Sequence, residues 1–130
     1  MRYLLDVNAL VALGFADHQF HDRVTRWIRA EHPVQLLTCP ITELGFVRVL
    51  AHIPEYGYSV AEARALLIGL KESKNLQLKF VPDSNDISSL PAWSKTAKQT
   101  TDGYLVQLAE SNHAVLATFD QRIHRSRLIP

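Results

Sequence analysis

The sequence predicts an α/β fold in which a parallel sheet of four or five strands is flanked by helices. Short apolar segments alternate with longer segments that repeat apolar residues at helical spacing, which is typical of βαβ units. The chain has 130 residues, of which 47% are hydrophobic, so residues 1–130 can bury the core of one domain. Its single cysteine, Cys39, excludes an internal disulfide.

Composition and charge exclude several classes of protein. The formal net charge is +1, so bulk electrostatics does not predict a protein that coats long nucleic acid, although basic residues are grouped locally. The apolar stretch 9–16 is too short for a membrane span, which takes roughly 20 residues, and it has no signal-peptide features. A lone cysteine also excludes a zinc site made of thiolates from this chain. We therefore expect a cytoplasmic protein that makes no membrane contact.

The first half of the chain supplies two strands and three helices. An apolar strand opens the chain, and Asn8 is expected to cap the helix that follows it. Pro33 ends the second helix, and Pro40 suits the first position of the third. The expected ranges are strands 2–5 and 34–38 and helices 9–16, 18–31 and 40–50.

The second half repeats the alternation. Ser59 and Glu62 form a capping box that starts a helix, and Thr101 is expected to open the last helix. Residues 82–99 hold two prolines and many polar residues, which predicts a short helical turn and a surface loop. The expected ranges are helices 59–73 and 102–111, strands 76–81 and 114–119, and a short edge strand in the tail.

Four acidic residues interrupt this pattern. Asp6 and Asp120 each follow the last residues of a strand, so in a parallel sheet they face the same rim, where such folds bind ligands. Glu43 and Asp102 each head a helix stripe, with apolar residues three, four and seven positions later. A carboxylate on the core-facing stripe is costly unless it is paired, neutralised or bound to a cation.

Each acid has an ordinary explanation when it is taken alone. Asp6 and Asp120 suit turns or caps, and an acid in a first helical turn, as expected for Glu43 and for Asp102 after Thr101, complements the helix dipole. Four such acids, however, all map to one rim if both helices begin there. We therefore predict that the four carboxylates converge.

Converging carboxylates repel one another, so a cation is needed to keep them ionised together. A set made only of oxygen donors suits Mg²⁺ or Mn²⁺ rather than zinc. Such a site polarises phosphoryl oxygens and activates water for in-line displacement. Asn8 and Thr118 stand close to these acids in the sequence and are expected to orient a carboxylate or a bound water.

At these residues the sequence resembles the PIN-domain ribonucleases, and among them the VapC-type toxins of toxin–antitoxin pairs. The matching segments are LLDVNALVAL with Asp6 and Asn8, PITELGFVRVL with Glu43, TTDGYLVQLA with Asp102, and LATFDQRI with Thr118 and Asp120. Each motif is short, but the four occur in the family's order and span the whole chain.

The resemblance implies a PIN-like three-layer fold and an acidic pocket that binds Mg²⁺ or Mn²⁺. It also implies endonucleolytic cleavage of RNA (transfer, ribosomal or messenger), inhibition by a cognate antitoxin protein, and a homodimer. By motif match, the catalytic and metal-coordinating residues are Asp6, Glu43, Asp102 and Asp120, with Asn8 and Thr118 in support.

The chain departs from the family's pattern at two places. Gly103 replaces the usual alanine beside Asp102, and glycine inside a helix costs roughly 1 kcal/mol relative to alanine. Gln121 and Arg122 stand where some members carry a further acid after the last aspartate. The second departure leaves open whether one or two metal ions act.

Two other interpretations stay open. A receiver-like signalling domain is also a small parallel α/β domain with acids and Mg²⁺, but it needs adjacent acids after its first strand, and Asp6 has none. A PIN-like module that binds RNA or protein without catalysis is the second. The presence of all four acids favours the enzyme over this module.

Overall fold

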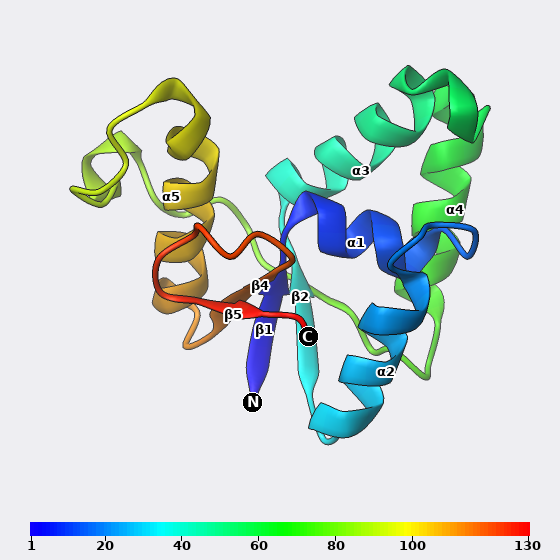
Figure 1. Cartoon of the computed structure of the whole chain (residues 1–130), viewed down its shortest axis with the longest axis horizontal. Helices are drawn as coiled ribbons and strands as arrows, with labels where there is room; N and C mark the ends of the chain where they lie inside the picture. Colours follow the sequence, from blue (N-terminus) through cyan, green and yellow to red (C-terminus); the bar gives the residue numbers. More distant parts are fainter.

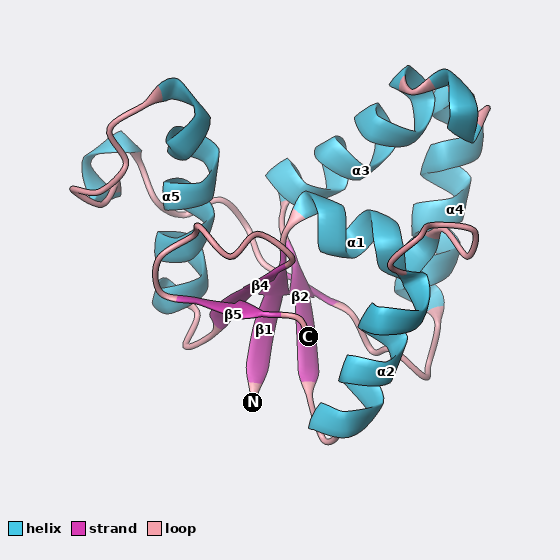
Figure 2. Cartoon of the chain, in the orientation of Figure 1, coloured by secondary structure: helices cyan, strands magenta, loops and turns pink.

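The computed structural model describes residues 1–130 and shows a five-stranded, fully parallel sheet with the strand order β3-β2-β1-β4-β5. The N-terminal strand β1 is therefore central, and its neighbours are β2 and β4 (Figure 2). The strands are β1 (Arg2–Leu5), β2 (Gln35–Thr38), β3 (Lys79–Phe80), β4 (Val115–Thr118) and β5 (Ser126–Leu128). The predicted parallel α/β fold is confirmed, with five strands.

Helices cover both faces of this sheet, which makes three layers. In Figure 1, α5 lies to the left of the sheet and the other four helices lie to its right. The helices are α1 (Val7–Gly14), α2 (His21–Glu31), α3 (Pro40–His52), α4 (Val60–Glu72) and α5 (Ala97–Ser111), with short 3₁₀ turns at Pro54–Tyr56 and Ile87–Ser89. No helix is both long enough and apolar enough to cross a bilayer.

Alternate residues of each strand supply the two cores. Tyr3 and Leu5 of β1 point into the larger cluster, under α1 to α4, whereas Leu4 points into the smaller cluster under α5. Strand β4 alternates in the same way, with Ala117 on the first side and Leu116 on the second. This two-residue period lets the short central strands bury side chains on both faces.

A close approach of two helices fixes the layer on the larger side. A β-carbon on Gly45 of α3 would overlap the side chain of Val7 in α1, so only glycine allows this separation. Because α1 begins directly after β1 and α3 begins soon after β2, the contact holds the starts of both helices at the same rim. That rim is the carboxyl end of the sheet.

The first helix starts two residues earlier than predicted, and its cap is different. Asp6, rather than Asn8, is the N-cap, and its carboxylate accepts a hydrogen bond from the Ala9 amide at 2.8 Å. The prediction that Asn8 caps this helix was therefore wrong. The strand ends at Leu5, so the next residue already has the extended backbone that a cap requires.

The last helix also begins earlier than expected. It starts at Ala97 with Thr96 as N-cap, and Thr96 and Gln99 form a capping box, so the predicted start at Thr101 was wrong. Asp102 consequently lies in the second turn, where the helix has no free amides for an acid to cap. An explanation of Asp102 as a helix-capping acid does not apply.

Two further elements are shorter than the sequence indicated. Helix α2 begins at His21, because His18 instead folds back in a turn and accepts a hydrogen bond from the Phe20 amide at 2.9 Å. Strand β3 covers only Lys79–Phe80, since Gln77 has a φ of 49°, which interrupts an extended strand.

Candidate functional site

The strand register brings the ends of β1, β2 and β4 to one level. Leu5 pairs with Ala117, and the Asp6 amide donates to the Ala117 carbonyl at 3.1 Å, so Thr118 is the neighbour of Asp6 on the next strand. On the other side Leu4 pairs with Leu37, which puts Thr38 beside Leu5, one residue before Asp6. Asp6 thus lies at the centre of the rim, and the neighbouring strand on each side ends in a buried threonine.

Asp6 is a buried acid without a cation partner. Only 8% of it is exposed, and this burial raises the pKa of Asp6 from 3.8 to about 6. A hydrogen bond from the Thr118 hydroxyl and one from the Ala9 amide act in the opposite direction, and the charges of Asp102 and Asp120 raise the pKa further. The ionised form is therefore under-compensated in this structure.

Asp102 reaches the same place from the opposite layer. It lies half-buried in α5, and partial burial raises its pKa, with a further contribution from the charge of Asp120. Asp6, Asp102 and Asp120 therefore interact electrostatically, although 96 residues separate the first from the second in the sequence. The structure brings together three of the four predicted carboxylates.

Asp120 differs from these two because it has a cation of its own. Arg122 donates from Nε and Nη2 to the two oxygens of the Asp120 carboxylate, at 3.0 and 2.9 Å, and its amide donates at 2.9 Å. These contacts lower the pKa of Asp120. The Asp120 amide in turn donates to the Thr118 hydroxyl at 3.0 Å, so Thr118 links Asp6 with Asp120.

Glu43 lies at the same rim but faces other partners. Its carboxylate accepts a hydrogen bond from the Thr38 hydroxyl at 2.6 Å and pairs with Lys71 of α4 at 2.9 Å. Lys71 is also 5.1 Å from the centre of the Phe80 ring, so its ammonium bridges the acid and an aromatic face. Glu43 is not among the charges that shift the pKa of Asp6. Of the four carboxylates expected to converge, Asp6, Asp102 and Asp120 thus influence one another's pKa at this rim, whereas Glu43 faces Lys71.

The two predicted supporting residues have different surroundings. Thr118 is fully buried between two of the acids, as described above. Asn8 is exposed and lines an open hollow of about 400 Å³, together with Phe119, Asp120, Gln121 and Arg122. A second hollow, of about 190 Å³, begins at Asp102 and Asp120 on the α5 side. Asp120 and Arg122 line both hollows.

The carboxylate oxygens at this rim are the kind of ligand that a hard divalent cation prefers. Two of the four predicted acids are already engaged in salt bridges, so only the other two are free to bind such a cation. No group of three His, Cys, Asp or Glu side chains is close enough to hold a metal ion as the side chains stand. Asp6 and Asp102 have raised pKa values and no salt bridge, which is the state that a cation would relieve. Asp120 and Glu43 would join them only by releasing Arg122 and Lys71.

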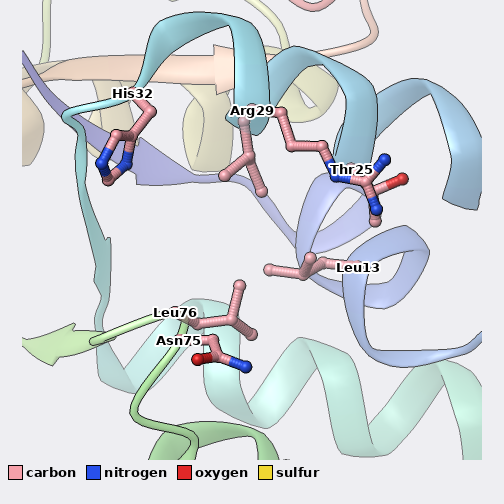
Figure 3. Close-up of a pocket in the computed structure, with 7 residues that line it drawn as sticks. Leu13, Thr25, Arg29, His32, Asn75 and Leu76 are labelled. Atoms are coloured by element: carbon pink, nitrogen blue, oxygen red, sulfur yellow. The ribbon is translucent and has the colours of Figure 1, made fainter.

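The larger hollows of the molecule lie away from these acids. One of about 470 Å³ is bounded by α2, the end of α1 and the segment before β3 (Figure 3). Arg29 and His32 come to it from one side and Asn75 and Leu76 from the other, with Leu13 between them. Another, of about 480 Å³, is a largely apolar groove between α3 and α4 that reaches Glu43 and Lys71. Neither contains Asp6, Asp102 or Asp120.

Sequence reasoning missed three residues at this rim. Lys71 is 28 residues from Glu43, and no local pattern connects the two. Arg122 was noticed as one of a group of basic residues and as a replacement for an acid, but not as a partner of Asp120, although the D-x-R spacing allows its side chain to fold back onto that acid. Trp93 was placed in an irregular loop, yet it lines the hollow that begins at the carboxylates.

Comparison with known proteins agrees with this architecture. A sequence model of the PIN domain matches residues 3–127. The chain is 35% identical over 124 residues to Ribonuclease VapC38 of Mycobacterium tuberculosis, a match that covers 90% of this chain and 84% of the relative. It is 36% identical over 129 residues to Ribonuclease VapC44 of the same organism, covering 95% and 89% of the two chains.

Solved structures share the fold at much lower identity. VapBC2 from Rickettsia felis, bound to a DNA fragment from its promoter, superposes with a TM-score of 0.66 at 13% identity, over 98% of this chain and 97% of the other. Mycobacterium tuberculosis VapC20, described as a Sarcin-Ricin loop cleaving toxin, gives 0.68 at 12% identity, over 98% and 99%. These structures show the shared fold. The match to the PIN-domain model and the ribonucleases that align over most of the chain show that the chain belongs to the PIN-domain family, in its VapC-type branch.

Proposed function

We propose that this protein is a metal-dependent endoribonuclease and the toxin of a type II toxin–antitoxin pair. The observation that carries the proposal is the group of Asp6, Asp102 and Asp120 at one rim, of which Asp6 and Asp102 have raised pKa values and form no salt bridge. The relatives that match most of the chain are named ribonucleases, which supports RNA as the substrate.

In this proposal Asp6 and Asp102 are the first ligands of Mg²⁺ or Mn²⁺, because neither forms a salt bridge and burial raises the pKa of both, although the charge of Arg122 partly offsets this at Asp102. Asp120 and Glu43 complete the set from either side, and a neighbouring cation holds each of them in place before binding. When bound, such a cation neutralises phosphoryl oxygens and lowers the pKa of a water. The four carboxylates act as metal-coordinating and catalytic groups.

The supporting residues position these acids. The Thr118 hydroxyl accepts a hydrogen bond from the backbone amide of Asp120 and donates one to the Asp6 carboxylate, so it ties the Asp120 backbone to Asp6. Asn8 lies in the open hollow beside Asp120 and offers an amide to a phosphate or a water that approaches from solvent. Arg122, once released from Asp120, is placed to bind a phosphate of the substrate.

The proposed substrate is a structured RNA with an accessible single-stranded loop, since proteins read RNA sequence mainly where bases are unpaired. Transfer RNA, ribosomal RNA and messenger RNA all offer such loops. The description of VapC20 as a toxin that cleaves the Sarcin-Ricin loop supports including ribosomal hairpins among the candidates. The proposed partners are a cognate antitoxin protein and a second copy of this chain in a homodimer.

A second function, binding of RNA or protein without catalysis, is favoured by one observation. Two of the four acids, Glu43 and Asp120, already have a cationic side chain as partner, which a purely structural pair would also explain. The receiver-like alternative is excluded, because receivers have the strand order 2-1-3-4-5 and this sheet has 3-2-1-4-5.

The test compares RNA cleavage by wild type and by Asp6→Asn in Mg²⁺, Mn²⁺ and EDTA, with transfer RNA and ribosomal hairpins as substrates. We expect discrete products that need the cation and are lost in the variant. The control is Asp17→Asn, a change of an exposed aspartate outside the site, which should cleave like wild type. Cleavage by Asp6→Asn at the wild-type rate would contradict the assignment of the site, and cleavage in EDTA would contradict the metal dependence.

A further inference from the structure

The hollow on the α5 side joins the carboxylates to an aromatic wall. It is lined by the acids Asp102 and Asp120, by Trp93 and Ile123, and by polar residues that include Lys98. Its volume is about 190 Å³. The ring of His124 lies against Trp93, with 5.4 Å between the ring centres and 50° between the planes. Aromatic, cationic and acidic groups thus meet within one small space.

Gly103 explains how the loop that carries Trp93 reaches this position. A β-carbon on Gly103 would lie 2.6 Å from Ser94 Oγ and 3.2 Å from Pro91 Cδ, so the loop rests directly on the backbone of α5. The loop is held there because the Ser94 hydroxyl donates to the Gln99 carbonyl at 2.5 Å. Since Gly103 follows Asp102, the loop is attached beside the acid, and Trp93 becomes a wall of the same hollow.

This combination matches the chemistry of a single-stranded nucleic acid. Proteins bind unpaired bases by stacking them on aromatic rings and bind the adjoining phosphates with lysine and arginine. Here the aromatic ring of Trp93 and the cations of Lys98 and Arg122 line one hollow together with Asp102 and Asp120, the acids proposed to act on a phosphodiester. A base on Trp93 would therefore belong to a nucleotide close to the bond that is cut.

We propose that Trp93 is a stacking platform for the base of a nucleotide next to the scissile phosphate, with Lys98 binding the adjoining backbone phosphate. The proposal rests on the proposed function for the position of the scissile bond. It adds a binding subsite and assigns it to unpaired RNA. Trp93 positions the substrate and takes no part in proton transfer or metal binding.

Packing alone is the competing explanation for Trp93. The ring also contacts the smaller core cluster under α5, and its Nε1 atom is buried without a hydrogen-bond partner. If Trp93 serves only to pack the core, replacing it should lower the stability of the protein. If it is a stacking platform, replacing it should weaken the binding of the RNA substrate. The two roles are separated by measuring binding with Trp93 left unchanged.

The first experiment uses tryptophan emission. The chain has two tryptophans, so Trp27→Phe leaves Trp93 as the single reporter, and Asp6→Asn in the same protein removes cleavage. Trp27 lies in the larger core against Tyr3, away from the acids. The probe is a mixed-sequence single-stranded RNA of about 20 nucleotides, a length that exceeds the roughly 4–16 nucleotides of a typical single-strand binding site. It is added in EDTA, with an oligonucleotide of the same length made of abasic ribose units as the control.

We expect saturable quenching of Trp93 by the RNA and little quenching by the abasic strand, which has the phosphates but no bases. Equal quenching by both strands, or by neither, would overturn the stacking proposal. Because this measurement needs no cleavage, it gives a decision even if no RNA is cut by wild type. In that case the proposed function fails, and the subsite is judged by the quenching alone.

The second experiment is kinetic and uses an RNA that wild type cleaves. Stacking of one base contributes about 1–3 kcal/mol, so Trp93→Leu should raise KM by about 5- to 150-fold, with a much smaller change in kcat. Trp93→Phe, which keeps an aromatic face, should recover most of the loss. A wild-type KM for Trp93→Leu would overturn the proposal while the nuclease function stands. If Trp93→Leu fails to fold, the emission titration with the RNA and the abasic strand decides.

Discussion

Replacing Asp6 with asparagine should stabilise the metal-free protein, although the same change should abolish cleavage. The introduced amide would keep an oxygen to accept the hydrogen bond that the Ala9 amide now donates at 2.8 Å, so the helix cap survives. What disappears is a buried negative charge that lies close to Asp102 and Asp120. A gain in stability is unusual when a functional residue is replaced, and here it follows from the burial of the Asp6 carboxylate.

The magnitude follows from the pKa of Asp6, which burial raises from 3.8 to about 6. Each pKa unit corresponds to about 1.4 kcal/mol, so ionising Asp6 costs the folded state up to about 3 kcal/mol. The folded protein holds this proton more tightly than the unfolded chain, so stability falls as the pH rises from about 4 to about 6, and the loss is complete above that range. For a chain of this size the gain in Tm at a pH of about 7.5 is up to about 10 °C.

The assay is thermal unfolding followed by circular dichroism in EDTA, from about pH 4 to about pH 8, a range that spans both pKa values of Asp6. Asp6→Asn should unfold at a higher temperature than wild type at the alkaline end, and the difference should shrink towards the acidic end. The exposed Asp17→Asn should change Tm little at any pH. Saturating Mn²⁺ should raise the Tm of wild type more than that of Asp6→Asn. A lower Tm for Asp6→Asn at the alkaline end, or a pH-independent difference, would refute the reasoning.

The remaining predictions concern two glycines and one ion pair. Gly69→Ala, on an open face of α4, should raise the free energy of unfolding, measured by urea titration, by about 1 kcal/mol. Gly103→Ala should lower the same quantity by about 1–3 kcal/mol, because the added methyl group forces the adjacent loop outwards. A stabilised Gly103→Ala protein would show that the loop gives way freely. Lys71→Gln removes the competitor for Glu43 and should lower the Mn²⁺ concentration for half-maximal cleavage, whereas Arg64→Gln, on the same helix, should not. Equal midpoints for both would argue against Glu43 as a ligand.

The sequence was a good guide where the information is local. Asp6 and Asp120 follow apolar strands, and the rule that parallel strands end at one rim placed both acids correctly. The capping box at Ser59 and Glu62 was also predicted correctly, because its two members are three residues apart. These features depend on short stretches of chain, and local propensity is enough to determine them.

Errors arose where two local signals compete or where contacts are distant. Thr96 and Gln99 form the same kind of capping box as Ser59, but the more obvious Thr101 was chosen, and the helix that carries Asp102 was therefore started too late. The pairing of Glu43 with Lys71 depends on how α3 packs against α4, which no pattern in either helix specifies. Side-chain partners across layers follow from tertiary packing, which this kind of reasoning does not reach.

The pairing of the first strand with the fourth also has a consequence during synthesis of the chain. Asp6 is synthesised more than 110 residues before its neighbour Thr118 and before Asp120, whose amide donates to Thr118. A nascent chain that stops short of β4 leaves one edge of the central strand unpaired and keeps the three aspartates apart. Assembly of the carboxylate group therefore awaits the synthesis of β4 and Asp120, which delays any activity of the site until these segments can pair with β1.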